Sequence, residues 1–149
     1  MKKVLFGLLM ATFFAFESAH AQTEYKVITM VESIVPGGLG RSRLIENKAE
    51  LNIDEYTTER TNGKNSGMGS VKRRDAKIGA FAESKILNLY TLVGLNFQNI
   101  ASNDALITSK LNQLSAEGWE LAHVVSGVES DAGETDGNGI DITRFIFKR

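Results

Sequence analysis

Few side chains in this sequence could carry acid–base chemistry, and His123 is the first of them. It lies in an apolar segment, 119–128, and is the only histidine after residue 21. A hydrolase would use it as a general base beside a nucleophile and an orienting carboxylate. The chain has no cysteine and no Gly-x-Ser-x-Gly nucleophile elbow. We therefore expect no catalytic residue, and a small periplasmic hydrolase that uses His123 with nearby acidic residues is the alternative.

Acidic side chains gather after this segment and raise the question of a cation site. A calcium loop places oxygen ligands at alternate positions, but Ile140 stands where the third ligand would follow Asp136 and Asn138. We therefore expect a solvated hairpin loop, without a metal. The acidic residues concerned are Glu129, Asp131, Glu134, Asp136 and Asp141.

A glycine-rich stretch, Pro36 to Arg41, could in principle cradle a phosphate. Phosphate loops open a helix, whereas the next residues, Arg41 to Asn47, have the composition of a returning strand. A hairpin turn is the interpretation we favour, and no cofactor is expected. The basic run Lys72 to Arg74 could touch lipid headgroups or anionic glycans, but three charges make a weak patch and a solvated loop flank explains them.

The N-terminus has the order of a secretory signal peptide. A cationic start, Met1 to Lys3, precedes an uncharged apolar run, Val4 to Phe16, and the small-x-small triplet Ala19 to Ala21. We expect cleavage after Ala21, which leaves residues 22–149 as one secreted or periplasmic domain. The apolar run of 13 residues is too short to span a bilayer, and no second such run follows. The net charge of −1 gives no reason to expect nucleic acid.

Alternating apolar and β-branched residues predict three strands, and a fourth segment is expected to return antiparallel to the first. The first covers 24–35, and apolar residues on both of its faces indicate a central position in a sheet. A return over 41–47 completes a hairpin, and strands over 119–128 and 140–147 form a second one.

Two helices are expected between the hairpins. Asp75 is the predicted cap of the first, whose apolar residues from Ile78 to Val93 recur at spacings of three and four before Gly94. A strand over 86–93 is the alternative for that segment. Ser102 or Asn103 is the predicted cap of the second helix, which ends at Gly118.

The resulting fold class is α+β: a small antiparallel sheet packed against one or two helices, in the order β-hairpin, helix, helix, β-hairpin. Residues 48–74 have the weakest signals for order, and 61–70 is expected to be a mobile loop because it has little apolar surface to bury. The expected core consists of Tyr25, Val27, Leu111, Leu114, Trp119, Leu121, Val125, Phe145 and Phe147.

Trp119 follows a helix stop directly, so we expect it to seal the helix end against the sheet; the alternative is an exposed ligand platform. The block Leu111 to Leu121, with Tyr25-Lys26-Val27 and the final Phe145 to Arg149, resembles the bacterial family called domain of unknown function 4177. That resemblance implies a β-α-β-β core and carries no catalytic residue. This chain inserts about seventy residues between the first strand and the helix, a gap that the family bridges in far fewer.

Taken together, the sequence predicts an exported, non-enzymatic domain that binds an unknown envelope component or associates with itself. A purely structural accessory protein is a further alternative.

Overall fold

The computed structural model describes residues 23–37, 41–129 and 139–149. The signal-peptide prediction, the centre of the glycine-rich turn and most of the acidic loop lie outside these residues. Five antiparallel strands form the main sheet in the order β3-β2-β1-β7-β6. They are β1 (Tyr25–Ser33), β2 (Arg43–Asn47), β3 (Phe81–Lys85), β6 (Glu120–Glu129) and β7 (Ile140–Lys148).

The predicted strands and the central position of the first one are confirmed. β1 lies in the middle of the sheet, where it pairs with β2 on one side and β7 on the other. A register irregularity between Leu121 and His123 lies on β6, one of the two edge strands. The fold is therefore mixed α and β as predicted, but it is mostly sheet rather than two helices between two hairpins.

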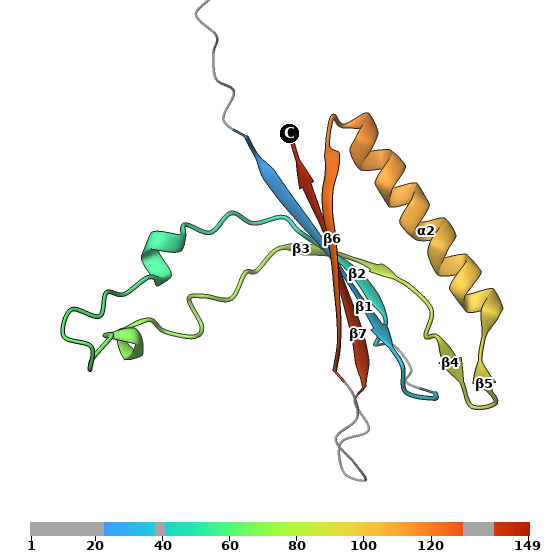
Figure 1. Ribbon diagram of the computed structural model, residues 1–149, viewed down its shortest axis with the longest axis horizontal. Coiled ribbons are helices and arrows are strands. Elements are labelled where there is room, and N and C mark those ends of the chain that lie inside the picture. Colours follow the sequence, from blue (N-terminus) through green and yellow to red (C-terminus); the bar gives the residue numbers. More distant parts are fainter. Residues whose placement is uncertain (1–22, 38–40, 130–138) are drawn as a thin grey trace, which may run out of the picture.

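The one α-helix of the described residues, α2 (Phe97–Ala116), packs along one side of the sheet (Figure 1). It begins at Asn96, whose Oδ1 accepts a hydrogen bond from the Asn99 amide at 3.0 Å. The prediction of a cap at Ser102 or Asn103 is wrong, because Asn96 is an earlier side chain that can satisfy the first free amides. Ser102 instead donates its hydroxyl to the Gln98 carbonyl within the helix.

The predicted helix stop is confirmed. Gly118 adopts a positive φ of 86°, and the amides of Gly118 and Trp119 bond to the carbonyls of Ser115 and Leu114. This is the Schellman arrangement, which favours glycine at the left-handed position. The chain therefore turns from α2 directly into β6.

The predicted helix from Ile78 to Val93 is wrong. Phe81–Lys85 pairs with β2 as the edge strand β3, and the chain then forms a two-stranded hairpin of β4 (Tyr90–Thr91) and β5 (Gly94–Leu95). Pairing with β2 satisfies the backbone of β3 through a distant partner, which local spacing does not report. The alternative of one strand over 86–93 is also wrong, because only its end lies in β4.

The core lies between α2 and the facing side of the sheet. It consists of Ile28, Met30, Leu44, Ile86, Leu114, Trp119, Phe145 and Phe147, with Ile107 and Leu111 packed against it. The void left between helix and sheet is about 10 Å³, no more than a single water molecule needs. Leu114, Trp119, Phe145 and Phe147 were predicted, whereas Tyr25, Val27, Leu121 and Val125 are exposed, so the prediction is wrong for these four.

Candidate assembly surface

The side of the sheet opposite α2 carries many apolar side chains and no covering element among the described residues. Ile28 pairs with Phe145 on the helix side, so the neighbouring pair Val27 and Ile146 points to the other side. The same alternation places further apolar residues there. The apolar residues of this open face are Tyr25, Val27, Val31, Ile45, Phe81, Val125, Ile140, Ile142 and Ile146.

An antiparallel sheet with one solvated face normally alternates apolar and polar residues, so that the solvated face is polar. Here Val27, Val125 and Tyr25 are exposed, while Ile142 and Ile146 are only half-buried. A contiguous apolar patch of this kind marks a contact site for another molecule. The open face is therefore the first candidate for function.

Charges on the open face are arranged unevenly. Near the β3 edge, Arg43 and Glu83 lie 3.9 Å apart, and at one end of the sheet Lys148 and Glu120 lie 3.5 Å apart. Arg144, on the interior strand β7, is exposed and makes no ion pair with any described residue. The middle of the face is thus apolar with one unneutralised cation.

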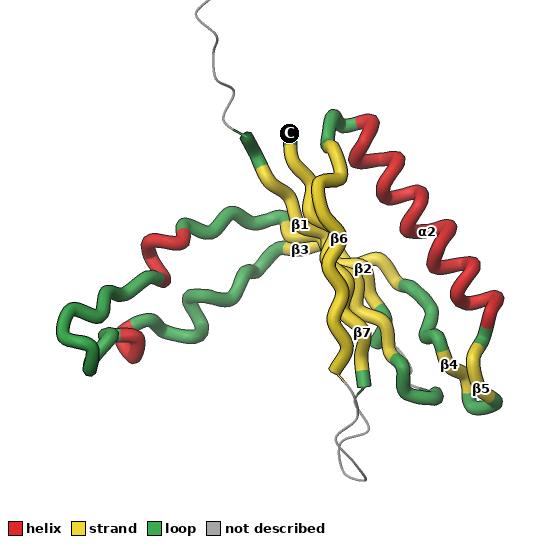
Figure 2. Tube along the Cα trace, in the orientation of Figure 1, coloured by secondary structure: helices red, strands yellow, loops and turns green. Residues whose placement is uncertain are grey.

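A long excursion between β2 and β3, residues 48–80, forms an arm that projects from the sheet on the side away from α2 (Figure 2). Its two short 3₁₀ turns, Ile53–Tyr56 and Met68–Ser70, do not pack against the sheet or the helix. Internal hydrogen bonds tie its two limbs together: the Tyr56 hydroxyl donates to the Asp75 carbonyl at 2.9 Å.

The arm exposes apolar side chains that have nothing to cover them in the described chain. Leu51, Ile53 and Met68 are each at least half exposed. Leu51 and Ile53 are interleaved with Glu50, Asp54 and Glu55, so this limb of the arm is both apolar and acidic. The predicted mobility of residues 61–70 stays a prediction.

On the helix side of the sheet, one carboxylate, Glu46, is neutralised by lysines. Glu46 points toward α2, and three ammonium groups surround it: Lys110 Nζ at 2.7 Å, Lys48 Nζ at 2.9 Å and Lys26 Nζ at 3.3 Å. Burial alone raises the pKa of Glu46, but hydrogen bonds and charges from the three lysines outweigh it and lower that pKa to about 2. The cluster anchors the helix and holds no reactive group.

A second buried polar contact joins α2 to the sheet. Asn103, almost fully buried, donates to Glu32 Oε1 at 3.0 Å and to the Leu87 carbonyl, and it accepts the Leu87 amide. Burial raises the pKa of Glu32, the Asn103 hydrogen bond opposes this, and the carboxylates of Asp141 and Asp104 add to the rise. The backbone of Leu87 lies outside the sheet, and the Asn103 side chain supplies the hydrogen-bond partners that a neighbouring strand would otherwise provide.

Among the described residues, none of the predicted reactive side chains lie together. His123 is exposed on the edge strand β6, and its side chain makes no hydrogen bond or ion pair with another described residue. Of the acidic run, Glu129 and Asp141 are described, and the described residues contain no group of acids or histidines spaced to hold a metal. The basic run Lys72 to Arg74 lies on the exposed arm.

Trp119 is 5% exposed, which confirms that it seals the helix end. Lys26 Nζ and the Arg149 guanidinium lie 4.8 and 4.4 Å from its ring centre, so cations cover what solvent could reach. The alternative of an exposed ligand platform at Trp119 is wrong.

Comparison with known proteins finds no family model, curated protein or solved structure that matches this chain. The resemblance to domain of unknown function 4177 therefore stays a prediction. None of the described helices is long and apolar enough to cross a membrane.

Proposed function

We propose that this chain is an exported, non-enzymatic assembly module that associates with a second copy of itself through the open face and the arm. The observation that carries the proposal is the apolar face of the sheet, which the described chain leaves uncovered. Uncovered apolar surface is unfavourable in water by about 25 cal/mol per Å², so its presence favours a partner.

The size of the face supports a second copy as that partner. With strands about 4.8 Å apart and a rise of about 3.4 Å per residue, the five strands offer a footprint of roughly 600 Å². Two such surfaces approach the 1,200 Å² or so that marks the lower end of stable protein interfaces. Contacts from the arm would add to this area.

The charges support a specific arrangement in which the arm of one copy lies on the open face of the other. The acidic limb of the arm, with Leu51 and Ile53 exposed beside Asp54 and Glu55, complements the apolar face with Arg144 at its centre. The arm also projects on the side of the sheet that bears this face (Figure 1). In a two-fold dimer each copy would give one arm and receive one.

Two neighbouring valines on β6 allow a matched test. Val125 lies on the open face and Val124 on the helix side, and their side chains are 56% and 52% exposed. Val125→Asp should shift the mature protein from dimer to monomer in sedimentation equilibrium, whereas Val124→Asp should leave the dimer intact. Arg144→Glu should also weaken association, and Glu55→Arg in the same chain should restore part of it.

A wild-type protein that is monomeric at high micromolar concentration would contradict the proposal. Turnover of an ester, amide or glycan that His123→Gln abolishes, with folding intact, would instead support the hydrolase alternative. Export is tested separately: intact mass of the secreted protein should correspond to a chain that begins at Gln22.

A further inference from the structure

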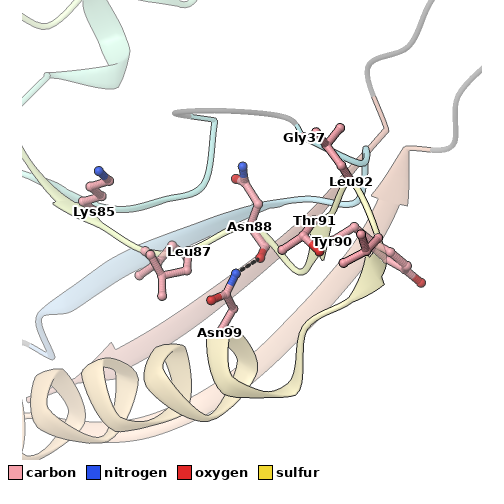
Figure 3. A pocket seen from close by; sticks show the side chains of 10 residues that line it. Gly37, Lys85, Leu87, Asn88, Tyr90, Thr91, Leu92 and Asn99 are labelled. Carbon is pink, nitrogen blue, oxygen red and sulfur yellow. Dashed lines mark hydrogen bonds between the residues drawn. The ribbon is translucent and has the colours of Figure 1, made fainter.

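A second feature lies at the other end of the helix from Trp119. A cavity of about 540 Å³ opens between the segment after β3, the β4–β5 hairpin, the turn at Gly37 and the first turn of α2 (Figure 3). Its volume falls within the range of small-molecule sites in proteins, roughly 300–1,000 Å³. Most of its wall is apolar and comes from Ile86, Leu87, Tyr90, Leu92 and Val93.

Side-chain amides fix the wall of this cavity. Asn99 Nδ2 donates to the Asn88 backbone carbonyl at 2.9 Å (Figure 3). The Ser42 hydroxyl donates to Asn88 Oδ1 at 2.6 Å. Asn103 holds both backbone groups of Leu87, each at 2.8 Å. Side chains of α2 and of the turn before β2 therefore fix the position of Leu87 and Asn88, which keeps the cavity open without a ligand. Most small-molecule sites are preformed in this way.

The mouth of the cavity is unusually apolar. Leu92 and Val93 form the tip of the hairpin and are 87% and 98% exposed, and Leu95 and Phe97 follow with exposed side chains. A single exposed apolar residue is ordinary, but four within six positions form a patch. A flexible apolar chain that enters from water would meet this patch first.

The charge around the cavity has one sign. Among the described residues that line it, Lys85 is the only charged one, and Asn99 brings the positive N-terminal end of the 20-residue helix α2 to the wall. No carboxylate of the described residues lines the cavity. An apolar wall with a cation at its border fits a ligand with an apolar tail and an anionic head.

We propose that this cavity binds a single-chain amphiphile with an anionic head, of the fatty-acid class. The tail would lie against Leu87, Tyr90 and Leu92, and the carboxylate would lie near Lys85. The cavity lies beyond the end of β3, where Lys85 pairs with Arg43 and so shares the side of the sheet that carries the open face. The proposal does not depend on self-association.

Decanoate and the uncharged 1-decanol are suitable probes, because they share a chain and differ in the head. Calorimetry with the mature protein should show one saturable site per chain for decanoate. Lys85→Gln should weaken decanoate binding roughly threefold to fivefold, which is the size of a partly exposed ion pair, and should leave decanol binding unchanged. Leu87→Trp, which adds bulk to the cavity wall, should abolish binding of both probes.

The control variant is Val125→Asp, which alters the open face and should leave decanoate affinity unchanged even where it dissociates the dimer. Methyl resonances of Leu92 and Val93 should move on titration, and those of Val27 and Val125 should not. Because both tip residues are exposed, Leu92→Ser provides a second variant that keeps the fold and should weaken both probes.

Three results of the binding measurements would overturn the proposal: no saturable decanoate binding, binding that Leu87→Trp and Leu92→Ser leave intact, or binding that Val125→Asp removes. Flotation with anionic phospholipid vesicles distinguishes the source of the chain. Flotation that decanoate abolishes would identify a bilayer lipid as the donor of the chain to this cavity, and its persistence in saturating decanoate would place the lipid contact elsewhere and contradict the proposal.

Discussion

The two faces of the sheet use the same strands, yet they are built differently. On the helix side, Ile28, Phe145 and Phe147 are almost fully buried, and the void beside them is about 10 Å³. On the open face, their immediate neighbours Val27 and Ile146 are equally apolar but remain exposed or half-buried. The side chains on the helix side therefore stabilise the fold, whereas those on the open face are available to a partner.

The largest expected effect compares Phe147 with Ile146. Phe147→Ala removes a ring that is 2% exposed and should lower the free energy of unfolding by about 3–5 kcal/mol. Ile146→Ala in dilute protein should cost only about 1 kcal/mol, because the side chain keeps contact with solvent. Urea unfolding of both variants measures this, and equal losses would show that the two faces are equally covered.

The second comparison sets Glu46 against Glu83. At pH 7, Glu46→Gln should cost up to roughly 3 kcal/mol, since the pKa of Glu46 falls from 4.5 to about 2 on folding. The carboxylate contributes fully above the unfolded pKa, so the loss should shrink between pH 4.5 and 2 and vanish below. Glu83→Gln, on the open face with a 3.9 Å pair to Arg43, should cost less than about 1 kcal/mol. Urea unfolding of both variants across this pH range measures the two losses of stability. Equal losses for Glu46→Gln and Glu83→Gln would contradict the role given to the three lysines.

The third comparison concerns Glu32, a helix-side carboxylate that is not neutralised. Because its pKa is raised in the folded protein, ionisation favours the unfolded chain as the pH rises from 4.5 through the folded pKa. Glu32→Gln keeps the acceptor for Asn103 and should therefore raise the thermal midpoint at pH 7–8. The gain should disappear below pH 4.5. A lower midpoint at neutral pH would mean that the charge is needed.

The smallest expected effect concerns the arm. Trypsin should cut at Lys64 or at Lys72 to Arg74, since these residues are exposed and far from the sheet. The nicked protein should keep its unfolding midpoint in dilute solution, with a change below about 0.5 kcal/mol. Resistance that grows with protein concentration would support coverage of the arm by a second copy, and resistance at every concentration would place the arm against its own chain.

Strands β1, β2, β6 and β7, the stop at Gly118 and the burial of Trp119 could be predicted because local pattern determines them. The sequence could not predict which face of β1 is buried. Val27 and Ile28 are both β-branched, and the helix that covers Ile28 is more than sixty positions away. The same limit explains the wrong helix over Ile78 to Val93, where pairing with β2 overrides local spacing. The cavity was missed because its wall comes from four separate segments held by Asn88, Asn99 and Asn103, whose amides carry no recognisable spacing.

The position of β7 between β1 and β6 has a consequence for the order of folding. Tyr25 pairs with Lys148, 123 positions later, and this ladder joins the two halves of the sheet. Such distant pairing closes slowly, because a large loop must be ordered before the contacts form. Until β7 is available, one edge of β1 is unpaired and β6 has no partner strand, so we expect the five-stranded sheet to close only at the end of synthesis. A sheet that closes so late would suit a transport step that accepts only extended polypeptide.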